Sequence, residues 1–171
     1  MSFFPEQPAR TSNDWTSRQV AMPSPAMQRH RGLRYQMSLM GAFRLITPDG
    51  RRLDISSKKA IALLALLATA ETGERWRSWL QGKLWGSLEP QQAQGGLRRE
   101  LHRLRKQTDD IGVPLLHCDF RAVRLNLSAI DVDIFRADSL VAVRGDFLEG
   151  IDIPREDAFE DWLRETRGAF S

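Results

Sequence analysis

Hydrophobic and polar residues recur along the chain with a period that differs from one region to the next. From Tyr35 to Leu45 the alternation has a period of two, which predicts a β-strand. Residues 47–50 read Thr-Pro-Asp-Gly, a turn sequence in which Pro fixes φ and Gly tolerates a positive φ. Leu53 and Ile55 then alternate with polar neighbours. The region therefore predicts a β-hairpin.

Three segments with helical spacing follow this hairpin. The first contains the apolar run 60–70, and Ser56 or Ser57 can cap its start. Almost every residue of that run is hydrophobic, so we expect this helix to be central. A second helix is predicted over 78–86 and a third over 89–108.

A second hairpin and an acidic segment complete the pattern. Residues 115–127 alternate again, with a bend at 119–121, and predict two antiparallel strands. After Leu127 the chain becomes acidic, and Pro154 opens an amphipathic helix. The hydrophobic side chains that this helix gathers on one face are Phe159, Trp162 and Leu163.

The order of hairpin, three helices and hairpin predicts an α+β fold of the winged helix-turn-helix type. It has an N-terminal β-hairpin, a three-helix core, a C-terminal wing hairpin and an acidic helical extension. We divide the chain into a leader (1–34), a winged-helix domain (35–127) and a mostly helical segment (128–171). The leader is predicted to be disordered, because its Pro and polar residues show no sustained period.

The third predicted helix has two contrasting faces. Leu97, Leu101 and Leu104 lie within about 60° of one another on a helical wheel, a stripe that packs on a core. Away from that stripe the helix carries cationic and amide side chains, namely Gln92, Arg98, Arg99, His102, Arg103 and Lys106. Cations neutralise phosphates, and Arg or Gln can read base edges, so this helix is predicted to bind the DNA major groove. An ordinary solvated basic face is the alternative.

The distribution of charge supports a polyanion-binding module. The net charge is only +3, but residues 37–127 carry fifteen Lys and Arg against nine acidic residues, whereas 128–171 carry five against eleven. We expect Arg121 and Arg124, near the hairpin bend, to contact DNA. Lys58 and Lys59 at a helix start oppose the helix dipole, which fits a phosphate contact, although solvated lysines fit equally well.

Several classes of chemistry are not supported by the sequence. Cys118 is the single cysteine, which excludes an internal disulfide and a cysteine-based zinc site, and we expect it on a buried strand. The three histidines are scattered, and no glycine loop matches a nucleotide-binding fingerprint. We therefore expect no enzyme, no metal and no cofactor. Without a secretory signal or an apolar run of membrane-spanning length, a cytoplasmic location fits best.

Two further groups of residues are open to more than one interpretation. Trp76, Trp79 and Trp85 could stack on bases, but beside leucines at helical spacing they are expected in the core. Gly95 and Gly96 fall inside the third helix, where each costs about 1 kcal/mol relative to Ala. They either loosen the start of that helix or allow a phosphate to approach the backbone closely.

Short motifs in a fixed order resemble a known family over residues 37–167. They are Leu39-Met40-Gly41-Ala42-Phe43-Arg44, Lys58-Lys59-Ala60, Leu63 to Ala68, Leu84-Trp85, Leu97-Arg98-Arg99, Leu104-Arg105, Gly145 to Gly150 and Phe159 to Leu163. The first six look like the OmpR/PhoB-type winged-helix domain of the SARP-type (antibiotic regulatory protein) activators. The last two look like the opening of the bacterial transcriptional activator domain, an array of helical repeats, which follows in that family.

The resemblance implies a sequence-specific transcriptional regulator, most often an activator. Its third helix would bind double-stranded DNA in the major groove, with the wing near the minor groove. It further implies direct-repeat sites, head-to-tail dimers on DNA and contact with RNA polymerase. By this resemblance residues 128–171 are expected to be a truncated activator segment, either because the sequence is a fragment or because the repeats have been lost. The stretch between Phe135 and Gly145 is shorter than the family's usual spacing.

Two other functions remain open. One is a winged helix used as a protein-interaction module, with a partner docked on Phe159, Trp162 and Leu163, although we expect these side chains to fold back on the N-terminal strands around Met37, Leu39 and Phe43. The other is a non-specific architectural DNA binder. The charge pattern favours DNA, because a pure interaction module has no need of an exposed cationic helix face.

Overall fold

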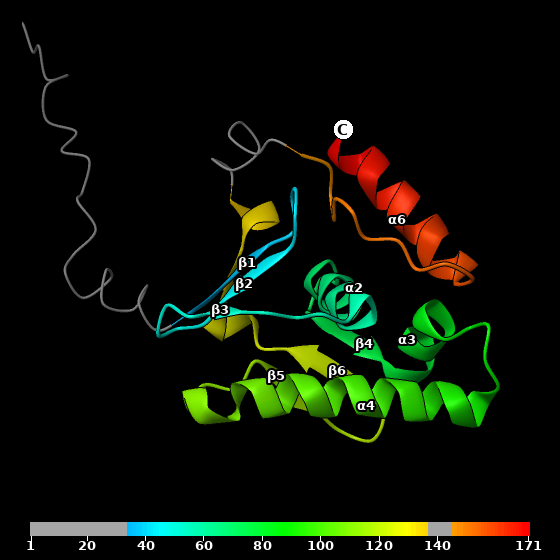
Figure 1. The fold of residues 1–171 in the computed structure, drawn as a ribbon, viewed down its shortest axis with the longest axis horizontal. Coiled ribbons are helices and arrows are strands. Elements are labelled where there is room, and N and C mark those ends of the chain that lie inside the picture. The colour runs from blue at the N-terminus through cyan, green and yellow to red at the C-terminus, as the bar shows by residue number, and fades with distance from the viewer. Residues whose placement is uncertain (1–33, 137–144) are drawn as a thin grey trace, which may run out of the picture.

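The computed structural model describes residues 34–136 and 145–171, which form an α+β fold with four α-helices and two small sheets (Figure 1). The strands are β1 (Tyr35–Ser38), β2 (Arg44–Ile46), β3 (Arg52–Leu53), β4 (Glu74–Trp76), β5 (Leu116–Cys118), β6 (Ala122–Leu125) and β7 (Ile130–Val132). The helices are α2 (Lys58–Ala68), α3 (Arg77–Leu84), α4 (Pro90–Thr108) and α6 (Asp157–Phe170). The predicted leader lies outside the described residues, except for Arg34.

Helix α2 lies at the centre of the molecule, as its composition predicted. All residues from Ala60 to Ala68 are buried, and α3, α4 and strands β4 and β6 pack against the helix, which lies in the middle of the ribbon (Figure 1). Ser57 is the N-cap, and its Oγ accepts a hydrogen bond from the backbone N–H of Ala60 at 3.2 Å. Both the capped start and the central position are therefore confirmed.

The larger sheet has the order β3-β2-β1-β7, with β1 antiparallel to β2 and parallel to β7. The prediction of one strand from Tyr35 to Leu45 is wrong, because the chain reverses between β1 and β2. Gly41 has φ +73°, and the Asp133 carboxylate accepts hydrogen bonds from the N–H groups of Leu39 (2.9 Å) and Met40 (3.1 Å). A side chain distant in sequence thus stabilises the break.

Strand β7 comes from the segment that was predicted to be mostly helical. Its pairing with β1 extends from Tyr35 opposite Ile130 to Met37 opposite Val132. Arg34 belongs to the same edge, because its guanidinium donates to the Ile130 carbonyl at 2.9 Å and lies 3.3 Å from the Asp131 carboxylate. The described chain beyond residue 127 therefore joins the N-terminal sheet before it reaches α6; a domain boundary at 127/128 stays a prediction.

The smaller sheet contains the second predicted hairpin, with the order β4-β6-β5. The β5–β6 hairpin has its bend at residues 119–121, as predicted. Strand β4 is a finding of the structure, because three residues are too few to show a period. Trp76 is the last residue of β4, opposite Ala122.

The C-terminal segment folds back onto the rest of the chain. The N–H of Leu148 donates to the Leu39 carbonyl at 2.7 Å, and the N–H of Gly41 donates to the Asp146 carbonyl at 2.9 Å. Phe159 and Leu163 of α6 are buried, and α6 packs against α3. The expected docking within the chain is therefore confirmed for these side chains, but α6 packs on α3, and it is residues 146–149 that contact the chain around Leu39.

The two glycines of α4 have different surroundings. A Cβ atom on Gly96 would lie 2.7 Å from Cε2 and 2.8 Å from Cδ1 of the buried Trp85 ring. A Cβ atom on Gly95 would meet only the Arg99 guanidinium, at 3.4 Å. Gly96 therefore allows α4 to pack closely against the end of α3, which neither sequence interpretation anticipated.

We predict opposite effects of alanine at the two positions. Gly96→Ala should lower the free energy of unfolding by about 1–3 kcal/mol, because Trp85 must move. Gly95→Ala should raise it by about 0.5–1 kcal/mol through higher helix propensity. Urea unfolding of the two variants measures both effects. Equal destabilisation by both would contradict the assigned packing of Gly96.

Removal of a buried α6 side chain should destabilise the whole chain. Phe159 is fully buried, so Phe159→Ala should lower the free energy of unfolding by about 3–5 kcal/mol. The exposed Glu165 of the same helix provides the control, and Glu165→Ala should change stability by less than about 0.5 kcal/mol. Thermal unfolding followed by near-UV circular dichroism measures both. A wild-type melting temperature in Phe159→Ala would show that the segment is not docked.

Candidate nucleic-acid interface

Helix α4 presents its predicted DNA-binding residues to solvent. Leu97, Leu101 and Leu104 are buried against the core, as expected. The residues predicted to face DNA are all exposed, namely Gln92, Arg98, Arg99, His102, Arg103 and Lys106. The buried leucine stripe thus fixes how α4 is rotated about its axis and leaves the cationic side of the helix exposed to solvent.

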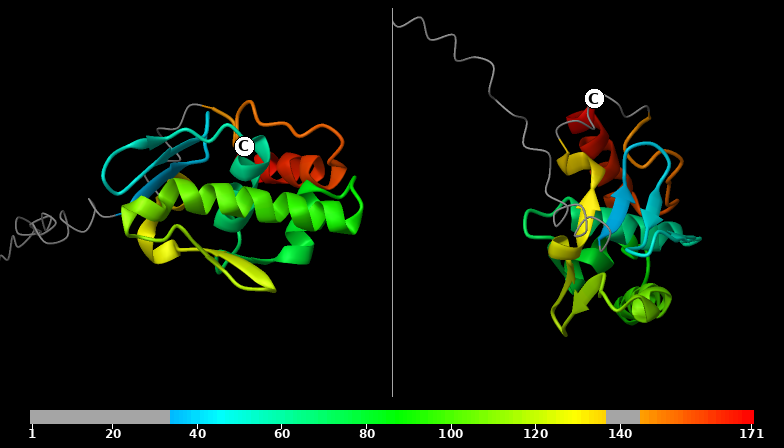
Figure 2. Two further views of the ribbon diagram at one scale, coloured as in Figure 1. Left: turned by 60° about the horizontal axis from the view of Figure 1, so that its bottom comes forward. Right: turned by 90° about the vertical axis from the view of Figure 1, so that its left-hand side faces the viewer.

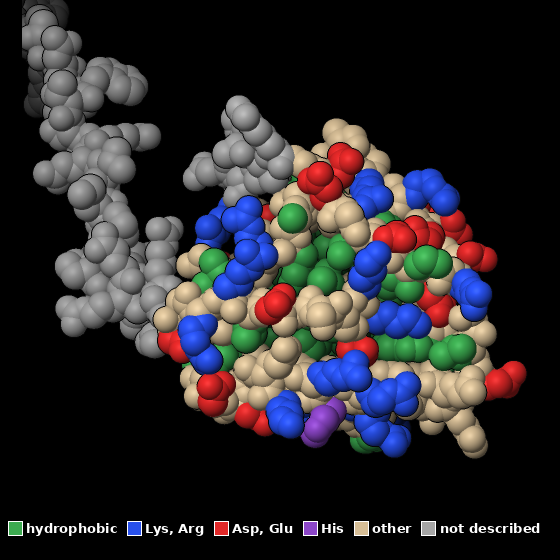
Figure 3. Space-filling model, in the orientation of Figure 1, with side chains coloured by type: hydrophobic (Ala, Val, Ile, Leu, Met, Phe, Trp, Pro, Cys, Tyr) green, Lys and Arg blue, Asp and Glu red, His purple; other side chains and the backbone are tan. Residues whose placement is uncertain are grey.

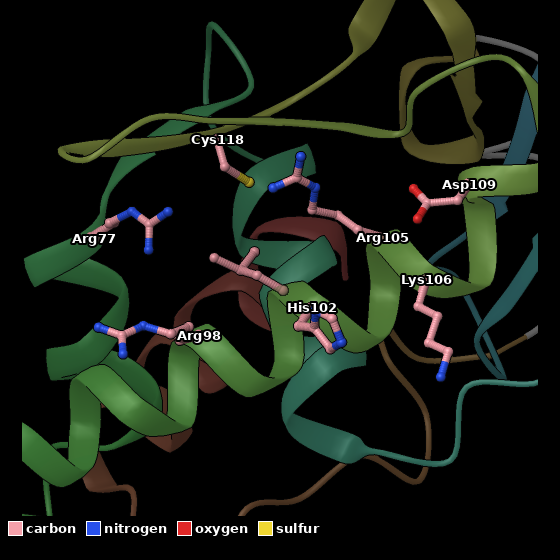
Figure 4. A pocket seen from close by; sticks show the side chains of 8 residues that line it. Arg77, Arg98, His102, Arg105, Lys106, Asp109 and Cys118 are labelled. Carbon is pink, nitrogen blue, oxygen red and sulfur yellow. The ribbon is translucent and has the colours of Figure 1, made fainter.

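A groove runs between α4 and the β5–β6 hairpin, which lie side by side in Figure 2. One hollow of about 560 Å³ is bounded by the start of α3, α4 and β5 (Figure 4). Its lining residues are Arg77, Arg98, Leu101, His102, Arg105, Lys106, Asp109 and Cys118. In Figure 4 the side chains of Arg77, Arg98 and Arg105 lie around the opening.

A second hollow of about 580 Å³ continues the first toward the start of α4. Both hollows share Arg77 and Arg98. The second is lined in addition by Trp76, Ser78, Gln81, Gln94, Phe120 and Arg121. We call the two together the basic groove. From Gln94 to Lys106 it follows α4 for roughly 18 Å, at 1.5 Å per residue.

The basic groove has an excess of positive charge. Asp109 is the one acidic residue among its lining residues, against four arginines and Lys106. Over residues 34–136 and 145–171, no carboxylate lies within ion-pair distance of Arg98, Arg105 or Lys106 on the α4 wall, nor of Arg77 or Arg121 on the opposite wall. Lys and Arg side chains gather over α4 in Figure 3. Unpaired cations on both walls make the groove suitable for a polyanion.

The hairpin bend is held firmly against α3. The N–H and Nε–H of Arg77 donate to the carbonyls of Arg121 (2.8 Å) and Asp119 (2.7 Å). The Asp119 carboxylate accepts from the N–H groups of Ala122 (2.8 Å) and Arg121 (2.7 Å), and these bonds hold the pKa of Asp119 below its usual value. The bend therefore projects its side chains in a defined direction.

Lys58 and Lys59 form ion pairs within the chain and do not line the basic groove. Lys58 Nζ lies 2.6 Å from the Asp152 carboxylate, and Lys59 Nζ lies 3.1 Å from the buried Glu156 carboxylate. The Lys58 hydrogen bond lowers the pKa of Asp152. Both lysines are thus paired with the C-terminal segment, and we do not include them in the candidate interface.

Two of the predicted arginines are also less free than expected. Arg124 pairs with Glu74 of β4 at 2.8 Å, so its charge is already balanced. Arg103 lies 3.4 Å from the Glu100 carboxylate on the same helix. Arg121 has no such pair among the described residues and lies over the Phe120 ring, 5.0 Å from its centroid. Of the two hairpin arginines, Arg121 therefore belongs to the interface.

The structure adds lining residues that the sequence did not single out. Arg105 and Gln94 share one side of α4 with Arg98, a spacing that the helical wheel could have revealed. Arg77 lines the groove only because α3 begins beside the hairpin bend. Local periodicity does not show that these two elements lie close together.

The three tryptophans have different surroundings. Trp85 is buried, as expected. Trp79 is half-buried, with the Arg75 guanidinium 4.3 Å from its ring centroid. Trp76 is 59% exposed and lines the basic groove, so its assignment to the core was wrong.

Among the described residues, no three potential ligands are placed to hold a metal ion, and no helix has the length and hydrophobicity needed to cross a bilayer. Comparison of the sequence with models of known protein families finds no match, and comparison with curated proteins finds none either.

Cys118 should react slowly with alkylating agents. Burial raises the pKa of its thiol, so the reactive thiolate is scarce at pH 7. We expect iodoacetamide to modify the native chain at least several-fold more slowly than the chain unfolded in guanidinium, with a rate that continues to rise at a pH above the ordinary pKa of a cysteine thiol. Mass spectrometry over time measures this. Equal rates would show that the thiol is not shielded.

Proposed function

We propose that this chain is a sequence-specific DNA-binding transcriptional regulator. In this proposal the described residues from Arg34 to Arg136 act as a winged-helix module, with the β5–β6 hairpin as the wing. The observation that carries the proposal is the basic groove, with unpaired cations along both of its walls. The resemblance of the sequence to SARP-type activators supports the same function.

The dimensions of α4 suit the DNA major groove. A helix with its side chains is about 10–12 Å wide, and the major groove is about 12 Å wide. The outward side of α4 offers Arg99 and His102, which can donate hydrogen bonds to base edges, and Gln92 at the first turn. These residues are proposed to read sequence, whereas Lys106 is proposed to contact phosphate.

The basic groove of the protein would hold one phosphodiester backbone of the duplex, the one between the major and minor grooves. If α4 enters the major groove and the hairpin reaches the adjacent minor groove, one phosphodiester strand must pass between them. Arg77, Arg98 and Arg105 surround that passage and would neutralise successive phosphates. This arrangement gives each wall of the groove a function.

The resemblance supplies the remaining elements of the proposal. Direct-repeat sites, head-to-tail dimers on DNA and recruitment of RNA polymerase are all proposed on that basis, and a cytoplasmic location is proposed from the sequence itself. Because α6 packs its apolar face on α3, a partner docked on Phe159, Trp162 and Leu163 is less favoured than it was from sequence. The protein-interaction alternative therefore needs another surface.

Single substitutions on α4 should separate base readout from phosphate contact. Arg99→Ala should weaken binding to a duplex selected from a random library by about 1–3 kcal/mol and relax preference at one position. Lys106→Ala should weaken all duplexes alike. Arg164→Ala on the exposed side of α6 is the control. Uniform weakening by Arg99→Ala would favour the architectural alternative, and wild-type affinity in both variants would refute the proposed helix.

The salt dependence of DNA binding should show whether a DNA strand lies within the basic groove. The Arg98→Ala/Arg105→Ala double variant should reduce the magnitude of the log–log salt slope by about 2, since each phosphate contact contributes about 0.9. Arg124→Ala, whose arginine is paired with Glu74, should change the slope by much less. Fluorescence anisotropy between 50 and 200 mM salt measures the slopes. An unchanged slope in the double variant would place the strand elsewhere.

A further inference from the structure

The tip of the β5–β6 hairpin exposes an aromatic side chain that the proposed contacts do not use. Phe120 is 82% exposed, although it is one of the largest hydrophobic residues of the chain. Trp76, 59% exposed, lines the same hollow of the basic groove. Exposed aromatic side chains gathered beside unpaired arginines indicate a surface that is covered on binding.

The backbone of the tip prevents Phe120 from folding away. Four hydrogen bonds between 2.7 and 2.8 Å, made by Arg77 and by the Asp119 carboxylate, hold residues 119, 121 and 122. A mobile loop could bury the ring against its neighbours, but a bend fixed on both sides keeps it in solvent. The Arg121 guanidinium, 5.0 Å from the ring centroid, places a cation beside it.

From this geometry we infer that Phe120 is a wedge for the DNA minor groove, with Arg121 on the phosphate or groove wall beside it. The inference depends on the proposed function, which places this tip over the minor groove. Apolar side chains that enter the minor groove partly unstack a base step and bend the duplex. Pyrimidine–purine steps such as TA and CA/TG unstack most easily. The wedge would therefore select such a step at a position that α4 does not read.

The site is assigned to duplex DNA rather than to a single strand. Both aromatic residues also suit base stacking in a single strand, but stacking platforms present successive rings along a groove. Here Phe120 stands at the outer end of a narrow hairpin, and Gln94 and Arg98 of α4 line the other side of the hollow. A protruding tip beside a helix fits two adjacent grooves of one duplex.

Selection from a random duplex library, followed by 2-aminopurine placed at successive positions of the selected duplex, tests this wedge. The wild-type chain should select a TA or CA/TG step at one fixed distance from the α4 site and raise 2-aminopurine fluorescence there. Replacement of that step by a GC step should weaken wild-type binding about tenfold, but binding of Phe120→Ala less than twofold. Phe135→Ala, which removes another exposed phenylalanine, should behave as wild type.

The outcomes separate the wedge from the proposed function. If Phe120→Ala keeps both the fluorescence change and the tenfold discrimination, while Arg99→Ala still loses sequence preference, the wedge is refuted and DNA binding stands. Tighter wild-type binding to the single strand than to its duplex would also refute the wedge. If the wild-type chain selects no duplex at all, the proposed function itself fails.

Discussion

The burial of α2 is the constraint on which the rest of the structure depends. A helix that is apolar on all sides is stable only where other elements cover it completely. Helices α3 and α4 and strands β4 and β6 of the smaller sheet pack against α2, and Ala60 to Ala68 are buried. Each of these elements gives one face to α2 or to its neighbours and leaves the other face free. The cationic side of α4 is exposed for this reason, because its leucine stripe faces inward.

The acidic C-terminal segment neutralises the two lysines at the start of α2 and leaves the groove-lining cations of α4 without acidic partners. Glu156, 4% exposed, accepts hydrogen bonds from Lys59 Nζ (3.1 Å), the Ser87 hydroxyl (2.8 Å) and the Ser87 N–H (3.2 Å). Asp152 pairs with Lys58. These carboxylates thus join the starts of α2 and α6 to the α3–α4 turn. The separation of charge along the sequence becomes a separation in space, which the proposed binding of a polyanion requires.

Close packing and a fixed hairpin bend together define the basic groove. Gly96 lets Trp85 lie directly against α4, which sets the distance between α3 and α4. Arg77, at the start of α3, then holds the hairpin bend through two backbone carbonyls. Arg77 also lines both hollows, so it stabilises the hairpin bend and adds positive charge to the groove. The exposed Phe120 is a consequence of this rigidity.

The sequence by itself determined the elements that depend on local physics. Periodicity located α2, α4 and the β5–β6 hairpin, and the leucine stripe of α4 determined which of its sides would be exposed. Tertiary structure decided whatever depends on residues far apart in the chain. The Asp133 carboxylate divides the first predicted strand, and the C-terminal carboxylates occupy Lys58 and Lys59. The basic groove likewise exists only where three elements meet, because no local pattern records which distant side chains will become neighbours.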